Sequence, residues 1–124
     1  MLSMLLDEMI SPVISEQVSI RRPEIDIQSI FHRRGGTLQK QLDALVLQAA
    51  AEDGLTLVTY DQRTILPLAS AWYAAGRTHE GILFVSESTI RSRDFGQLIR
   101  ALEQFWVREH QQVWTNRIDF LRAP

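Results

Sequence analysis

Continuous apolar runs alternate along the chain with segments whose apolar positions recur every three or four residues. The continuous runs predict short strands that are buried on both faces of a sheet. They lie at residues 1–6, 55–59 and 81–85. Two shorter segments, 24–27 and 117–121, alternate between apolar and polar residues, and we expect the second of them to be an edge strand. The pattern therefore predicts a sheet of four to five strands.

Helices are predicted between these strands. Ser11 followed by Pro12 favours a helix start, because serine caps the first turn and proline fits its first position. Possible caps for the later helices are Thr37, Thr64 and Asp94, and Pro67 would then lie in a first turn. We expect three tryptophans to lie in the core or at an interface: Trp72, Trp106 and Trp114.

Strands that alternate with helices form a βαβ series, which predicts a three-layer α/β/α sandwich around a mostly parallel sheet. The chain of 124 residues is expected to be a single domain, residues 1–124. It contains no cysteine, so disulfides, thiolate metal sites and cysteine nucleophiles are excluded. With neither a membrane-length apolar run nor a signal-like start, we expect a cytoplasmic protein without membrane contact.

Two of the predicted strands end on an aspartate. Asp7 and Asp61 follow the first and third strands, and parallel strands bring such ends to one edge of the sheet. Asp43 comes early in the helix that precedes the strand leading to Asp61, so we expect it at the same edge. Three converging carboxylates repel one another unless a cation joins them, and ligands that are all oxygen favour Mg²⁺ or Mn²⁺.

Each aspartate also has a structural interpretation. Asp7 and Asp61 suit turns and helix caps, and Asp43 suits a solvated helix face. Taken singly, the two interpretations are about equally favoured, and it is the expected convergence of all three acids that favours a metal site.

Positive charge in this chain is almost entirely arginine. Of 13 basic residues only Lys40 is a lysine, while the net charge of −2 gives no global argument for nucleic acid. The arginine fork suits phosphate, although a biased genome composition explains the same count. Candidate RNA contacts follow predicted strands, with solvated loop charges as the alternative: Arg33, Arg34, Arg91 and Arg93.

Several of these segments resemble a known family. Residues 43–50 followed by 57–61 resemble the paired helix-then-strand motif of PIN-domain nucleases. Leu5-Leu6-Asp7-Glu8 followed by Ser11-Pro12 resembles the opening of a short PIN-like subfamily often found as toxins of bacterial type II toxin–antitoxin pairs. Residues 81–85 after His79 resemble the same subfamily, so the resemblance covers nearly the whole chain.

The resemblance implies a PIN-like fold and a Mg²⁺- or Mn²⁺-dependent endoribonuclease, in which a metal-bound water attacks an RNA phosphodiester. Asp7, Asp43 and Asp61 match the acidic metal ligands of the family, and Thr59 matches a hydroxyl residue that supports the site. The implied partners are an RNA substrate and a small cognate antitoxin. A homodimer is a further expectation, from the family and from the apolar C-terminal helix that contains Trp106.

The sequence also departs from the family pattern. The segment 27–42 lacks the further glutamate of PIN domains, so Glu8 or Glu87 would have to replace it. Arg63 stands where an acid is common, and it would either hold phosphate or pair with Asp61 and displace metal. The alternative function is therefore a catalytically weakened PIN-like domain that binds protein or RNA.

Overall fold

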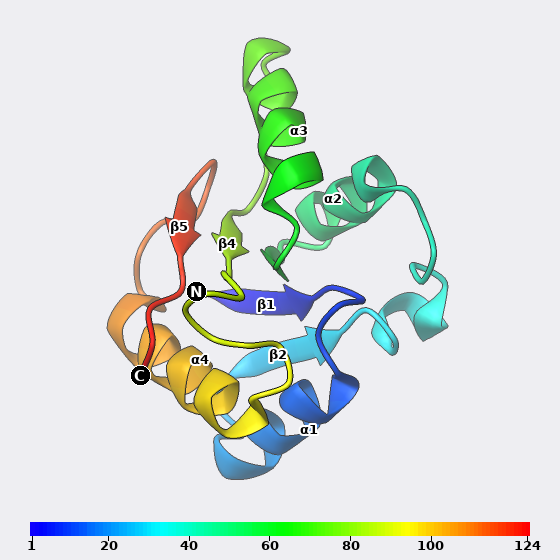
Figure 1. The fold of residues 1–124 in the computed structure, drawn as a ribbon. Helices are drawn as coiled ribbons and strands as arrows, with labels where there is room; N and C mark the ends of the chain where they lie inside the picture. Colours follow the sequence, from blue (N-terminus) through cyan, green and yellow to red (C-terminus); the bar gives the residue numbers. More distant parts are fainter.

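The computed structural model describes residues 1–124 and has strands alternating with helices throughout (Figure 1). The strands are β1 (Ser3–Leu6), β2 (Asp26–Ser29), β3 (Thr56–Thr59), β4 (Ile82–Phe84) and β5 (Ile118–Phe120). The helices are α1 (Pro12–Arg21), α2 (Asp43–Glu52), α3 (Gln62–Ala74) and α4 (Phe95–Glu109), with a short 3-10 segment at Arg33–Gly36.

The five strands form one sheet in the order β2-β1-β3-β4-β5, and every neighbouring pair is parallel. The predicted sandwich is therefore confirmed, with a fully parallel sheet and β5 at its edge. Strand β2 pairs with one side of β1, and the chain then crosses to the other side of β1, where β3 pairs with it. A change of direction of this kind leaves a crevice at the carboxyl ends of the two strands, where α/β proteins bind ligands.

Helices cover both faces of the sheet. Buried residues of α1 and α4 pack against one face, and those of α2 and α3 pack against the other. The central strand β1 serves both layers, because Met4 and Leu6 lie in the first core and Leu5 lies in the second. This is the arrangement that a continuous apolar run predicts. The three tryptophans are buried, as expected.

Two of the predicted helix starts are confirmed by their hydrogen bonds. The Ser11 hydroxyl accepts a hydrogen bond from the Val13 N–H, and Pro12 occupies the first position of α1. The Asp94 carboxylate accepts one from the Gln97 N–H at the start of α4. In both helices the side chain before the first turn satisfies a backbone donor that has no partner within the helix.

The expected start of the second helix at Thr37 is wrong. The Thr37 hydroxyl donates to the Arg34 carbonyl within a loop, and Lys40 has a φ of +59°, which no α-helix accommodates. Helix α2 therefore begins only at Asp43. Strand β2 also begins two residues later than predicted, because residues 22–25 close a turn in which the Ile25 N–H donates to the Arg22 carbonyl.

The expected start of the third helix at Thr64 is also wrong. Asp61 is the cap of α3, and its carboxylate accepts a hydrogen bond from the Thr64 N–H at 3.1 Å. Because α3 already begins at Gln62, Pro67 lies inside the helix and not in its first turn. Proline lacks an N–H, so the Arg63 carbonyl loses its helical donor there.

None of the helices combines the length and the apolar character needed to cross a membrane.

We expect Gly81→Ala to destabilise the fold strongly. Gly81 has a φ of +102°, and a Cβ there would lie 2.8 Å from Trp114 Cε3 and 3.0 Å from the Trp114 carbonyl oxygen. The expected loss in free energy of unfolding is about 2–3 kcal/mol, measured by urea denaturation. Gly76→Ala is the matched control, because Gly76 has a φ of +72° and open space around its Cβ position. It should cost only about 1 kcal/mol, and equal losses would contradict the steric argument.

Candidate functional site

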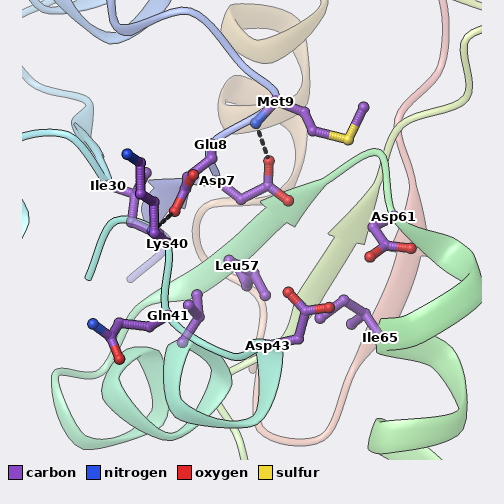
Figure 2. Close-up of a pocket in the computed structure, with 11 residues that line it drawn as sticks. Asp7, Glu8, Met9, Ile30, Lys40, Gln41, Asp43, Leu57, Asp61 and Ile65 are labelled. Atoms are coloured by element: carbon purple, nitrogen blue, oxygen red, sulfur yellow. Dashed lines mark hydrogen bonds between the residues drawn. The ribbon is translucent and has the colours of Figure 1, made fainter.

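The carboxyl ends of β1 and β3 bring acidic side chains together, as predicted. Asp7 follows β1 directly, and its N–H donates to the Val58 carbonyl of β3, which keeps the two strand ends paired. Asp61 follows β3, and Asp43 is the first residue of α2. These three aspartates and Glu8 line one cavity of about 230 Å³. Figure 2 shows the three aspartate carboxylates pointing into the same space from different elements.

The wall of the cavity on the α2–α3 side of the sheet is apolar. It is formed by side chains that belong to or pack against the second core: Ile30, Val46, Leu57 and Ile65. The carboxylates therefore lie next to an apolar surface that offers them no hydrogen bonds. This raises the free energy of their charged forms.

Thr59 connects the two acids at the strand ends. Its buried hydroxyl donates to Asp7 Oδ2 and accepts a hydrogen bond from the Asp61 N–H at 3.0 Å. The other oxygen of Asp7 accepts from the Met9 N–H at 3.0 Å. Burial raises the pKa of Asp7, the two hydrogen bonds oppose this, and the charges of Asp43 and Asp61 raise it further. Thr59 thus holds the Asp7 carboxylate in place among like charges.

Asp43 and Asp61 point toward the same part of the cavity (Figure 2). The pKa of Asp43 is raised by burial, by the charge and side chain of Asp61 and by the charge of Glu8. One oxygen of Asp61 is also engaged in capping α3. Asp61 therefore fills the structural role that its position after a strand suggested, and it faces Asp43 as well.

No cationic side chain neutralises this cluster. None of the four carboxylates takes part in an ion pair. Lys40 is the single cation among the residues that line the cavity, and its side chain also forms no ion pair. Arg63 is exposed, does not line the cavity and does not pair with Asp61. The negative charges of these acids are therefore not balanced by an ion pair.

The side chains at this site have the chemistry that a hard divalent cation needs, but their positions do not enclose one. All the charged donors are carboxylate oxygens, which suit Mg²⁺ or Mn²⁺. No group of three or more acidic or histidine side chains is arranged to hold a metal ion directly. Mg²⁺ usually keeps several waters and takes one or two carboxylates, which Asp43 and Asp61 can provide.

Of Glu8 and Glu87, the two further acids that the sequence offers for this site, only Glu8 lies at it. Glu8 lines the cavity and accepts a hydrogen bond from the Lys40 backbone N–H. Glu87 lies outside the cavity, in the loop after β4. Hydrogen bonds from Ser92 and the nearby charges of Arg93 and Arg91 lower the pKa of Glu87. These two arginines therefore accompany Glu87 and do not line the acidic cavity.

Arg33 and Arg34 are not among the residues that line the cavity. Both donate to the Asp53 carboxylate at 3.2 and 3.0 Å, and Arg34 also pairs with Glu52. These acids end α2, whereas Asp43 begins it, and ten helical residues span roughly 15 Å. The two arginines anchor the loop after β2 to the far end of the helix.

The pattern of the sequence did not identify Lys40 and Met9 as residues of the cavity wall. Met9 directly follows Asp7 and Glu8 after β1, and this position in the sequence is enough to predict that it lies near the cavity. Lys40 lies in a loop whose path depends on the left-handed residues Arg34 and Lys40, and no periodic pattern encodes that path.

We expect Thr59→Val to lower the free energy of unfolding by about 1–3 kcal/mol, because it leaves partly buried groups of Asp7 and Asp61 without partners. Thr56→Val is the matched control on the same strand, where the hydroxyl donates only to the Glu80 carbonyl. The pKa of Asp7, followed by NMR, should rise in Thr59→Val alone. An unchanged Asp7 titration would contradict the role given to Thr59.

Two substitutions of aspartate by asparagine, Asp43→Asn and Asp53→Asn, should change the stability at neutral pH in opposite directions. Asp43 has a raised pKa, so the folded state binds its proton more tightly and stability falls as pH rises. Asp43→Asn should therefore be stabilising near neutral pH, with the gain vanishing below the ordinary aspartate value of 3.8.

Asp53→Asn is the control of opposite sign. Hydrogen bonds from Arg34 and Arg33 lower the pKa of Asp53, so its contribution is present at neutral pH and is lost as pH falls. Urea denaturation at a series of pH values measures both differences. Parallel pH profiles for the two variants would contradict the assigned electrostatics.

Comparison with known proteins gives no relative from which to transfer a function. No family model, curated protein or solved structure matches this chain. The carboxylates that line the cavity between β1 and β3 are therefore the feature of this protein that bears on its function.

Proposed function

We propose that this protein is a metal-dependent endoribonuclease that hydrolyses RNA phosphodiesters at the acidic cavity. The observation that carries the proposal is a set of four carboxylates around one cavity, with no ion-pair partner, at the crevice between β1 and β3. Keeping like charges together without a cation costs stability, and a divalent ion relieves that cost. The resemblance of residues 43–50 and 57–61 to PIN-domain nucleases supports the same chemistry.

In this proposal Asp7, Asp43 and Asp61 hold Mg²⁺ or Mn²⁺. Such an ion supplies a Lewis acid for a phosphodiester oxygen and a lowered pKa for an attacking water. Thr59 orients the Asp7 carboxylate through its hydroxyl, and the start of α3 orients Asp61. Outer contacts of this kind fix the direction of metal-binding carboxylates.

The proposal extends to partners of the protein. RNA is the substrate, and the resemblance to toxins of type II pairs supports a small antitoxin as the natural inhibitor. A homodimer is proposed on the same resemblance.

The test compares RNA cleavage in Mg²⁺ and Mn²⁺ by the wild type, Asp43→Asn and Asp61→Asn. Each variant should lose about 100-fold or more in activity, because even outer partners of metal ligands contribute 10–100-fold. Asn still accepts the helix-capping hydrogen bond, so Asp61→Asn removes the charge and keeps the cap. Asp94→Asn is the matched control, since Asp94 caps α4 in the same way outside the cavity, and it should keep full activity.

Thermal unfolding gives a readout that does not depend on turnover. Mn²⁺ at 100 times its dissociation constant should stabilise the wild type by about 2.7 kcal/mol, and Asp43→Asn should lose this gain. Equal cleavage by the wild type and both site variants would rule out the three-acid site. Metal binding or RNA binding without cleavage on several RNAs would favour the alternative, a PIN-like domain that only binds.

A further inference from the structure

Lys40 is held at the rim of the acidic cavity in an unfavourable backbone conformation. Its φ of +59° is left-handed, which costs a residue with a side chain about 1–2 kcal/mol. The Glu8 carboxylate, which projects from the end of β1, accepts a hydrogen bond from the Lys40 N–H. One of the four acids is thus used to position the only lysine of the chain. Strained residues with this kind of support cluster at functional sites.

The ammonium group of Lys40 is free to bind an external anion. The side chain is exposed and forms no ion pair, although four carboxylates line the same cavity. Figure 2 shows Lys40 beside Glu8 and Ile30, with Asp61 on the opposite side of the cavity. The cation is therefore separated from the carboxylates of Asp43 and Asp61 (Figure 2).

From this geometry we propose that Lys40 binds a phosphate of the substrate next to the scissile one, so that the cavity selects a polynucleotide over an isolated phosphodiester. The inference rests on the proposed nuclease function and deepens it. Asp43 and Asp61 mark one end of the cavity as the reaction centre, and Lys40 marks the other end as a contact for the continuing backbone. Lys40 is a substrate-positioning residue in this scheme, and the compact charge of lysine suits a flexible strand.

The test uses two substrates: a short single-stranded RNA, which has several phosphates, and bis(p-nitrophenyl) phosphate, which has only the scissile one. Lys40→Asn removes the charge with a residue that tolerates the left-handed backbone. It should raise KM for the RNA about threefold to tenfold with little change in kcat, and leave KM for the small diester unchanged. Lys40→Arg should restore the wild-type KM.

Salt dependence gives an independent measure. RNA affinity from fluorescence anisotropy should depend less steeply on salt in Lys40→Asn, with the slope of log affinity against log salt smaller by about 0.7, which is one phosphate contact. Arg122→Asn is the control, because Arg122 is exposed near the C-terminus and outside the cavity, and its slope should match the wild type.

The outcomes separate this inference from the nuclease proposal. If Lys40→Asn changes neither RNA affinity nor KM, or shifts KM for both substrates equally, the inference is overturned and the nuclease proposal stands. If Asp61→Asn cleaves RNA as well as the wild type, the assignment of the reaction to the three-acid site fails. In that case a weaker, less salt-dependent RNA affinity of Lys40→Asn would still support its phosphate contact, and an unchanged affinity would overturn it.

Discussion

The parallel pairing of β1 with β3 is the interaction on which the rest of the site depends. The pair continues to the Asp7 N–H and the Val58 carbonyl, so both strands end at the same level. The buried hydroxyl of Thr59 then joins Asp7 to the backbone of Asp61. The apolar side chains of β1 fill the cores on both sides of the sheet, and this fixes the direction in which the acids leave it. Core packing and acid placement therefore have the same origin.

The fold holds these carboxylates close together, although their charged forms lower the stability of the protein. Burial and mutual repulsion raise the pKa values of Asp7 and Asp43, which means that their charged forms oppose folding. At the other end of α2, Asp53 is paired with Arg33 and Arg34. The contrast between paired acids at the far end of α2 and unpaired acids at its start distinguishes a structural region from a candidate reactive one.

Structural and chemical roles overlap in this cavity. Asp61 caps α3 and lines the same cavity as Asp43. Glu8 supports the backbone of Lys40 while adding to the negative charge around Asp43. A residue can serve both purposes because a carboxylate has two oxygens and several acceptor positions. A capping role for Asp61 therefore does not argue against a role in metal binding.

The sequence by itself determined the order of strands and helices, the burial of β1 on both faces and the common edge of Asp7, Asp43 and Asp61. These features follow from local apolar periodicity and from the rule that parallel strands end together. Only the tertiary structure decided the path of the loop after β2, which contains Arg33, Arg34, Thr37 and Lys40. Left-handed residues shape this loop, and so do ion pairs with acids at the end of α2, about twenty positions further along the chain. Distant pairings of this kind leave no periodic trace along the chain, so its pattern could not place the one cation that lines the cavity.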